Sequence, residues 1–586
     1  MAVSTPENLS GSSLGGKRGA AYRRFLQLET DRSSWRGQWQ EITDYLLPRR
    51  GRYLMESQST KGRKRNSKII DNSAGQALRT MTAGMMSGLT SPARPWFRLM
   101  TEDQDMMDGD GVKKYLGDVE QILRRILSAS NFYSAASTVY FELGAFGTAP
   151  VMRRKHPQLH VHYRNFTAGE YVIAENEFGQ VDTIGREFTM TISQAVEEFV
   201  WDKLTEKFDW DKVSRTTKTL WDQQNYDAQV PTVHMIQPRR QAERDLSKMD
   251  GMNRPFADLY FEKGADRDVL LKEDGYNRFP VFVPRWDVLS GDVYGHSPAM
   301  ETLGDIKQLQ HEQRRKAQAI DKMVNPPMRA SVSLKGSPTT VLPGGNTYVD
   351  PMNGNDGFAP VYQIQPRINE LMMDIQEVQG RIQRGFYADL FAMMINSDRR
   401  QMTATEVAER HEEKLVLLGP VLQRLNSEFL DPMIEDAFLV ASEQGLLPEP
   451  PQALQGQQIR IKYVSLLAQA QEAASASSME RTMAFVGNLT GVAPDILDNF
   501  DTDVAAREYA DIMGTSPALV RDIVVRDKIR ADRQEAQQQA QQQEQAAAAV
   551  DVAGKGAQAA KLLSETDSQN PNALTSLLQR GQSRGI

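Results

Sequence analysis

The chain contains no cysteine among its 586 residues, so disulfide bonds and thiolate metal sites are both excluded. No stretch approaches the roughly 18 uninterrupted apolar residues of a membrane-spanning helix. The first residues also lack the apolar core that a secretory signal needs. We therefore expect no membrane span, and the absence of cysteine is compatible with assembly in a reducing cytosol.

The chain also lacks the excess of basic residues that is usual in a protein that grips DNA tightly. Lys and Arg number 69 against 76 Asp and Glu, which gives a formal net charge of −7. Because tight binding to DNA requires the phosphates to be neutralised, any contact with DNA must be local and weak, as in a conduit. The chain is too long for a single hydrophobic core, so two to four substructures are expected.

No complete nucleotide-binding motif is found. Residues 11–17 nearly form a phosphate-binding P-loop, but the next residue is Arg18, where a Ser or Thr hydroxyl is needed to hold magnesium. No hydrophobic strand precedes this segment either. We interpret the match as chance within a flexible Gly/Ser-rich tail, and its failure argues against an ATP-driven motor.

Metal and catalytic motifs are incomplete in the same way. The acidic residues of 103–110 resemble a calcium loop, but their spacing is off by one and Lys114 stands where the bidentate Glu should be. His156, His160 and His162 could suggest zinc, yet there is no Cys and no HExxH motif. No Ser/His/Asp arrangement or paired-carboxylate signature stands out. We expect no metal, no cofactor and no catalytic residue, and hence a protein that is not an enzyme.

The N-terminal part is predicted to be mainly helical. The Ser/Gly-rich residues 1–16 are expected to be disordered. An amphipathic pattern predicts a helix over 22–47 that ends at Pro48, and further helices are predicted at about 71–90 and 112–129. A basic loop separates the first two helices, and it is either a patch facing nucleic acid or the capsid or an ordinary solvated loop. Its basic residues are Arg49, Arg50, Arg52, Lys61, Arg63, Lys64, Arg65 and Lys68.

Between about residues 150 and 290 the hydrophobic period changes to two, which indicates strands. Alternating segments lie at 159–163, 171–174 and 183–189, and the turn at 177–180 predicts a hairpin between the last two. Further strands are expected near 231–236, 257–262 and 280–286. We predict an α+β region of ordinary globular character here.

Two long helices are predicted on either side of a Gly/Pro-rich excursion. Ser297 and Pro298 suit the N-cap and first position of a helix that runs to about Val324, where the sequence 325–327 stops it. A second long helix begins near Arg367, and its apolar residues follow the 3-4 spacing of a heptad seam. The residues of this seam are Ile368, Leu371, Ile375, Val378 and Ile382.

The middle of the first long helix, residues 310–316, is polar on all sides. Such a turn cannot lie inside a globular core, because unpaired buried charge is costly. It can lie in a wall one helix thick, although an exposed helix of a two-stranded coiled coil is the alternative. In the second helix, Gly380 and Gly385 predict close approach of helices at a subunit interface. The stripe of positive and amide groups on the first helix comprises Lys307, His311, Arg314, Arg315, Gln318 and Lys322.

The connection after the second long helix, residues 391–402, combines Met side chains with the pair Arg399 and Arg400. Because Met side chains are flexible and adapt to changing partners, this segment is either an adaptable contact loop or an ordinary loop between helices. If it contacts DNA, the two arginines are the residues that we expect to reach the phosphates.

A third helix is predicted to follow. It opens with a capping box at 403–406 and continues to about Ser442, with kinks at 419–420 and at Pro432. Further helices are expected after it. The Ala/Gln-rich stretch 533–550 is compatible with either a helix or a disordered segment.

Five segments, in this order along the chain, resemble the portal family of short-tailed bacteriophages. Each motif alone is moderately specific, but five in order cover most of the chain. The segments are 71–99, then 292–301 with 303–307, then 402–407, then 459–464 with 466–471, and the Gln/Ala-rich ending.

The resemblance implies the portal fold, which is α+β and predominantly helical and assembles as a dodecameric ring around an axial channel. The implied regions are a disordered tail at 1–16, the wing at 17–296, stem helices at 297–325 and 367–390, the clip at 326–366, a channel loop at 391–402, a long kinked helix returning to the wing at 403–464, and the crown at 465–586.

The resemblance also implies a function and a set of partners. The function is a head-to-tail connector at one capsid vertex that serves packaging, retention and ejection of double-stranded DNA. The implied partners are the terminase packaging motor, the major capsid and scaffolding proteins, tail adaptor and tail proteins, and internal ejection proteins. Assembly would take place in the host cytoplasm, and the mature location would be the virion.

The mechanism expected for such a chain is passive, because an acidic ring with a few mobile basic groups makes many weak, sequence-independent contacts with DNA. Arg399 and Arg400 are the main candidates for these contacts. The weaker candidates in the stem are Lys307, Arg314, Arg315 and Lys322. The alternative function is a helical scaffold or tail-adaptor protein that has no DNA channel.

Overall fold

The computed structural model describes residues 16–54, 67–101, 111–156, 158–202, 205–330, 335, 358–360, 367–392, 418–454, 459–465, 467–468, 482–488, 499–512 and 523–564. The chain divides into two units, residues 1–501 and 502–586. Helices predominate and are accompanied by several small sheets, so the expected α+β class is confirmed. In the part of the chain that the structure describes, no helix is both long and apolar enough to cross a membrane.

Four helices near the N-terminus contribute to the largest hydrophobic core. They are α1 (Lys17–Tyr45), α2 (Ser73–Leu89), α4 (Val112–Ala129) and α5 (Phe132–Phe146). The helices predicted at 71–90 and 112–129 are confirmed, and α1 begins about one turn earlier than expected. Trp39, Leu78 and Tyr140 are fully buried in this core, which fixes the helices to one another.

A five-stranded antiparallel sheet follows in the chain, with the strand order β10-β9-β8-β5-β4. The hairpin predicted around 177–180 is confirmed, and Gly179 in its turn has a φ of +74°, a conformation that glycine adopts without strain. The strands predicted near 231–236 and 257–262 are confirmed as well. The five strands are β4 (Tyr171–Glu175), β5 (Val181–Thr191), β8 (Gln229–Pro238), β9 (Phe256–Glu262) and β10 (Lys272–Tyr276).

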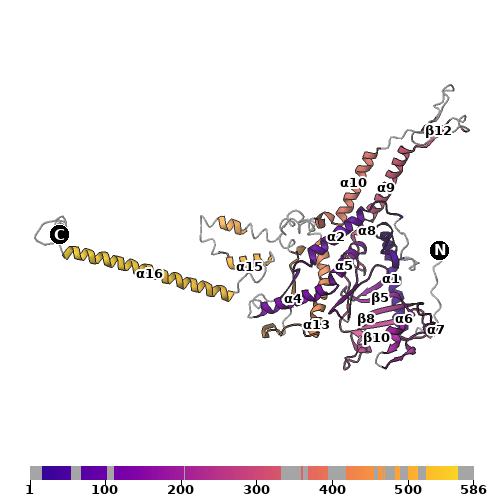
Figure 1. The fold of residues 1–586 in the computed structure, drawn as a ribbon, viewed down its shortest axis with the longest axis horizontal. Coiled ribbons are helices and arrows are strands. Elements are labelled where there is room, and N and C mark those ends of the chain that lie inside the picture. Colours follow the sequence, from indigo (N-terminus) through magenta and orange to yellow (C-terminus); the bar gives the residue numbers. More distant parts are fainter. Residues whose placement is uncertain are drawn as a thin grey trace, which may run out of the picture. The chain divides into compact units, whose positions relative to one another are not determined.

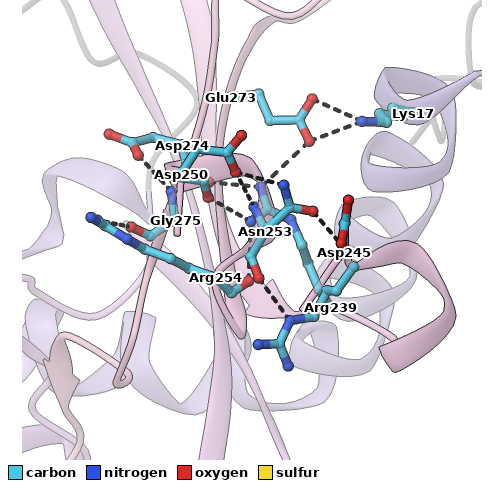
Figure 2. Close-up of polar contacts among 11 residues, drawn as sticks. Lys17, Arg239, Asp245, Asp250, Asn253, Arg254, Glu273, Asp274 and Gly275 are labelled. Carbon is cyan, nitrogen blue, oxygen red and sulfur yellow. Dashed lines mark hydrogen bonds and ion pairs between the residues drawn. The ribbon is translucent and has the colours of Figure 1, made fainter. Parts of the chain in front are cut away.

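The connection between β8 and β9, residues 239–255, covers the outer edge of this sheet at β10. Figure 2 shows the guanidinium of Arg239 reaching the β10 backbone, where it donates to the carbonyl oxygen of Asp274 at 2.8 Å. Arg254 donates to the carbonyl oxygen of Gly275 at 3.0 Å. An exposed edge strand can pair with a strand of another chain. The structural role of this connection is therefore to cover the edge strand β10.

Two of the smaller sheets join segments that are far apart in the sequence. One contains β2 (Val151–Arg154), β3 (His162–Asn165) and β11 (Val281–Phe282), and the other pairs β1 (Phe97–Thr101) with β14 (Ile459–Tyr463). The strand predicted at 159–163 overlaps β3 only at its end. The strand predicted at 280–286 is reduced to β11, because Pro284 cannot donate a ladder hydrogen bond.

The helices α9 (Leu303–Val324) and α10 (Ile368–Gly385) lie side by side and project from the rest of their unit (Figure 1). We call them the stem pair. The heptad seam is confirmed at Ile375, Val378 and Ile382, which are buried. With 22 residues, α9 is about 33 Å long. Beyond the stem pair, β12 (Met328–Ala330) pairs with β13 (Phe358–Pro360).

The helix predicted over 297–324 is confirmed except for an interruption at Thr302. A short helix, α8 (Pro298–Glu301), comes first, and its predicted cap is confirmed, since the Ser297 hydroxyl accepts from the Met300 N–H at 3.1 Å. The Thr302 hydroxyl then donates to the carbonyl oxygen four residues earlier at 2.8 Å. Such local bonding by Thr competes with a regular helix.

The two glycines of α10 have different surroundings. A Cβ placed on Gly385 would lie 2.2 Å from the Thr302 methyl carbon, so this close approach is made within one chain. The interpretation of Gly385 as a subunit-interface glycine is therefore wrong. A Cβ on Gly380 would meet nothing within 4 Å. A role at a subunit interface therefore stays a prediction for Gly380 alone.

The described part of the third helix begins at 418, and residues 403–417 lie outside the described residues. A π-helical turn, η9 (Asn426–Leu430), leads into α13 (Asp431–Glu443). Pro432 lies two residues after the end of this turn. Because proline lacks an N–H and its ring clashes with the carbonyl of residue i−4, a widened turn accommodates it. The predicted irregularity at Pro432 thus takes the form of a π-helical turn.

The C-terminal unit contains α15 (Thr502–Ile512) and α16 (Ile523–Ser564). The Ala/Gln-rich stretch 533–550 lies inside α16, so of the two alternatives the structure has the helix. Asp503 accepts from Arg526 at 3.0 Å and from Arg530 at 2.6 Å, which ties the two helices together.

Candidate functional site

The main candidates for DNA contact, Arg399 and Arg400, lie outside the described residues, as does most of the 391–402 connection. Most of the excursion 326–366 lies outside them too. The site can therefore be built from the stem pair and the elements that hold its base.

Lys307, at the inner end of the predicted basic stripe, is engaged within the chain. Its Nζ lies 2.7 Å from Glu41 Oε2 on α1, and 5.7 Å from the centre of the Tyr45 ring. The ion pair is partly exposed, so it attaches the stem to α1 only weakly. Lys307 is consequently the weakest of the stem candidates for DNA contact.

The outer members of the stripe face solvent. Arg314, Arg315 and Lys322 are exposed. The Arg315 Nε donates to His311 Nε2 at a long 3.5 Å. These three cations are therefore placed on a solvent-facing surface of α9, as the helical spacing predicted.

The prediction that the turn 310–316 cannot lie inside a globular core is wrong for Gln310 and Glu312, which are buried. The Gln310 side-chain oxygen accepts from the backbone N–H groups of Ile70 and Asp71 at 2.6 and 2.9 Å, and its amide donates to the Asp71 carbonyl at 2.8 Å. Because the oxygen and the nitrogen of the Gln310 side-chain amide are both hydrogen-bonded, burial of this amide carries little penalty.

The same segment of chain supplies a carboxylate that binds both stem helices. Asp71 Oδ2 accepts from the side-chain amides of Gln313 at 2.8 Å and Gln379 at 3.0 Å, and Oδ1 accepts from the Ser73 N–H at 2.7 Å. We call these residues, with Gln310, the Asp71 cluster. Burial of the carboxyl opposes ionisation, but the hydrogen bonds outweigh it and hold the pKa of Asp71 below its ordinary value. The Asp71 cluster fastens the base of the stem pair to the start of α2.

Among the residues that the structure describes, the outer half of the stem pair has no such attachment. Several large apolar side chains there are exposed in a single copy of the chain, which is unusual for a helix pair that carries a buried seam lower down. These residues are Ile320, Met323, Val324, Met372 and Met373. A neighbouring surface is needed to remove them from water.

Two residues of the predicted basic loop are anchors within the chain. Arg50 lies 2.7 Å from the fully buried carboxylate of Glu142, and Lys68 lies 2.7 Å from Asp44. Burial raises the pKa of Glu142 to about 7, against the opposing effect of Arg50. The middle of the loop, residues 55–66, lies outside the described residues.

A buried arginine joins the π-helical turn η9 to the β4–β5 hairpin of the five-stranded sheet. Arg285 donates to Glu428 in the π-helical turn at 2.7 Å, to Glu175 at the end of β4 at 2.9 Å, and to the Gly179 carbonyl at 2.6 Å. Burial raises the pKa of Glu428, and Arg285 opposes that shift. The helix that follows the 391–402 connection is thus fixed to the β4–β5 hairpin.

The three histidines considered for zinc are involved in other contacts. His156 Nδ1 accepts from the backbone N–H groups of Gln158 and Leu159 at 3.1 and 3.2 Å, and His160 bonds to Gln444. Over the described residues, no group of three His, Cys, Asp or Glu side chains is placed to hold a metal ion. The P-loop-like and calcium-loop-like segments lie almost entirely outside the described residues.

Comparison with known proteins places this arrangement in a family. Residues 18–520 match the family described as "Bacteriophage head to tail connecting protein". The chain is 44% identical over 555 residues to the "Probable portal protein" of Bordetella phage BPP-1, covering 94% of this chain and 96% of that protein. It is 40% identical over 556 residues to the "Portal protein" of Salmonella phage epsilon15, covering 95% and 97%.

Proposed function

The chain belongs to the family of bacteriophage head to tail connecting proteins, and on that premise we propose that its copies form a ring around an axial channel at one capsid vertex. Double-stranded DNA enters the capsid through this channel during packaging, is retained by it and leaves through it at ejection. The observation that supports the proposal is the stem pair, whose inner half is fastened to the body while its outer half exposes apolar side chains. Copies arranged around a closed symmetry axis bury those side chains against one another.

Within this ring, residues 17–296 form the wing, the stem comprises 297–325 and 367–390, and 326–366 form the clip. The connection 391–402 is the channel loop, 403–464 return to the wing, and 465–586 form the crown. Twelve copies make the ring. The closed ring uses the space at Gly380, where nothing of the same chain lies within 4 Å of an added Cβ.

The channel handles DNA passively. Arg399 and Arg400 contact phosphates from the channel loop, and Arg314, Arg315 and Lys322 add weaker contacts from the stem. Lys307 contributes least, because Glu41 already neutralises it. With a net charge of −7 the ring does not hold DNA tightly, so the DNA slides through it without sequence preference. The chain performs no catalytic step and uses no metal or cofactor.

The ring resides in the virion after assembly in the host cytoplasm. The clip docks the terminase packaging motor and later the tail adaptor and tail proteins. The wing contacts the major capsid and scaffolding proteins, and internal ejection proteins gather at the crown.

Electron microscopy of the purified chain tests the ring. End-on views should show annuli with a central hole, and the double variant Met372→Asp/Met373→Asp should shift the protein toward monomers. A control variant at a solvent-facing site of the wing, Met249→Asp, should leave the annuli intact. Filaments or small open oligomers in place of annuli would support the alternative of a scaffold or tail-adaptor protein without a channel.

Charge reversal tests the DNA contacts. Arg399→Glu/Arg400→Glu should reduce packaging or DNA retention in assembled particles, while the exposed Lys248→Glu on the wing should not. Unchanged packaging and retention in the double variant would remove the channel-loop arginines from the mechanism.

A further inference from the structure

The connection between β5 and β8 is far longer than the sheet requires. Thr191 at the end of β5 is paired with Gln229 at the start of β8, so a tight two-residue turn would join the two strands. Instead the chain makes an excursion over residues 192–228, which we call the aromatic insertion. Its first helix, α6 (Ile192–Ala195), is followed by two very short strands and by α7 (Arg215–Asp222).

The inner face of the aromatic insertion has an ordinary structural role. Val196, Phe199 and Val200 are buried together with Met190 and Val230 of the sheet in a small hydrophobic cluster. This cluster explains why the aromatic insertion packs on the sheet. Trp210 and Trp221 also pack against this cluster, so it accounts for those two rings in part but not for Trp201, Phe208 and Tyr226. In this the insertion differs from the β8–β9 connection, whose contacts serve the sheet edge (Figure 2).

The outer face carries five aromatic rings in contact with one another. Trp201 and Phe208 are cross-strand partners with ring centres 4.8 Å apart. Phe208 stacks on Trp210 at 5.5 Å, Trp210 lies 6.1 Å from Trp221, and Trp221 lies 4.8 Å from Tyr226. Three of the seven tryptophans of the chain are thus gathered on one surface module.

These rings are only partly covered. Phe208 is 45% exposed and Tyr226 is 40% exposed, while Trp201, Trp210 and Trp221 are intermediate. Trp and Tyr are enriched among the few interface residues that contribute most of the binding free energy. The cluster therefore forms a continuous ring surface whose outer side remains available to a partner.

The backbone of the aromatic insertion is irregular at three places. A π-helical turn, η3 (Val196–Val200), leads directly to Trp201. Glu206 has a φ of +50°, which is costly for a residue other than glycine. Gln224, with a φ of +57°, directly follows the C-cap of α7, where the Asn225 N–H donates to the Leu220 carbonyl at 2.9 Å as in many helix ends. Glu206 and Gln224 are two of the three non-glycine residues with positive φ in the described part of the chain. Strain of this kind persists where the surrounding structure fixes it, and it is concentrated at functional sites.

The charge of the aromatic insertion selects the class of partner. Over residues 192–228 there are eight Asp and Glu against five Lys and Arg. Ion pairs neutralise charges of both signs here, since Lys212 lies 3.2 Å from Asp209, Arg215 lies 3.6 Å from Asp266 and Arg267 lies 3.9 Å from Asp211. The surplus of carboxylates therefore remains. An acidic surface of this kind repels phosphates, which disfavours nucleic acid as the occupant.

A cation is the natural complement of this surface. The Lys218 Nζ lies 5.8 Å from the centre of the Trp210 ring, so one ring already carries a cation of the same chain. A guanidinium group suits such a site better than an ammonium group, because its planar face stacks on aromatic rings while its N–H groups bond carboxylates.

We propose that the aromatic insertion is a docking site for a basic, arginine-containing segment of a partner protein. Arginine side chains of the partner stack on the outer faces of Phe208 and Tyr226. Exposed carboxylates of the same insertion, among them Glu197, Asp222 and Asp227, neutralise them. This proposal is independent of the DNA channel, since it concerns the wing and not the stem.

The test uses the full-length chain and short fluorescein-labelled peptides at physiological salt, with fluorescence anisotropy as the measurement. A peptide of alternating Arg and Gly should bind, the matched Lys peptide should bind several-fold more weakly, and the matched Glu peptide and an oligothymidylate of similar length should not bind. Phe208→Ala and Tyr226→Ala should each weaken binding of the Arg peptide about tenfold, as expected for loss of one desolvated ring contact. Phe178→Ala, at an exposed aromatic residue of the β4–β5 turn, is the matched control and should bind like the parent chain.

The two ring variants keep the charge of the chain, so they separate ring stacking from general attraction of a basic peptide to an acidic protein. Equal binding by the parent chain and by Phe208→Ala and Tyr226→Ala would overturn the proposal. Stronger binding of the oligothymidylate than of the Arg peptide would also overturn it, in favour of nucleic acid. If Phe208→Ala fails to fold by circular dichroism, Tyr226→Ala decides the question.

Discussion

The inner and outer halves of the stem pair are built from similar helix-forming residues, yet they differ in what surrounds them. In the inner half, Leu309 and Val378 are fully buried and the Asp71 cluster joins both helices to α2. In the outer half, Val324 is 81% exposed and Met373 is 70% exposed. The inner half is thus stabilised by its own chain, whereas the apolar side chains of the outer half remain exposed to water.

The largest effect that separates the two halves is expected from truncation of their apolar side chains. Leu309→Ala should lower the free energy of unfolding by about 2–5 kcal/mol, because it leaves a cavity in a packed core. Val324→Ala should change it by no more than about 0.5 kcal/mol, as for other exposed sites. Urea unfolding of the monomeric chain measures both, and similar losses in the two variants would contradict the comparison.

Gly385 and Gly380 give a matched pair of substitutions within one helix. Gly385→Ala should destabilise the chain by about 1–3 kcal/mol, because the new Cβ would overlap the Thr302 methyl group. Gly380→Ala should stabilise the monomer by up to about 1 kcal/mol, since alanine favours helix and the space around this site is open. The same Gly380→Ala variant should impair ring assembly in electron micrographs. Normal rings would show that no other copy uses this space.

The Asp71 cluster should make the inner half sensitive to acid. Asp71→Asn removes a charged acceptor of several hydrogen bonds and should lower stability by about 1–3 kcal/mol at neutral pH. Because the pKa of Asp71 is lower in the folded state, its contribution is present above the ordinary pKa of an Asp and is lost as the pH falls through the lowered value. Urea midpoints at neutral and acidic pH check this. The control is Asp321→Asn in the outer half, which should show neither loss.

The smallest effect is expected at the two ends of the basic stripe. Lys307→Met should cost at most about 1 kcal/mol, because the ion pair with Glu41 is partly exposed, and that cost should vanish at high salt. Lys322→Met should leave stability unchanged. Thermal unfolding at low and high salt distinguishes them, and a salt-independent loss for Lys307→Met would assign it a packing role along its aliphatic stem.

Local features of the fold could be predicted from the sequence where neighbours in the chain decide the structure. The Ser297 cap, the seam at Val378 and the β4–β5 hairpin all depend on spacing within about ten residues, and all are present. The helix α5 received no prediction. Its residues are buried on nearly every side, so it has no apolar-polar period to detect.

Contacts between distant segments could not be predicted in this way. Gln310 shares the helical spacing of Leu303 and Ile306, which was the one available signal that it would be buried. Its hydrogen-bonding partners come from residues 70–71, and no local pattern connects those positions. The pairing of Lys307 with Glu41 is of the same kind. The helical spacing therefore predicted the exposed basic stripe, but it could not predict that Lys307 would be paired with Glu41.

The exposure of α16 determines how this helix should unfold when the protein is heated. From Arg530 to Gln543 every side chain is exposed, so this part of the helix is held by the intrinsic preferences of Ala, Gln, Glu and Arg and not by a packed interior. Such a segment loses its ellipticity gradually with rising temperature, whereas a region with a cooperative interior melts within a narrow interval. A sloping baseline before the main melting step is therefore the expected thermal signature of this exposed part of α16.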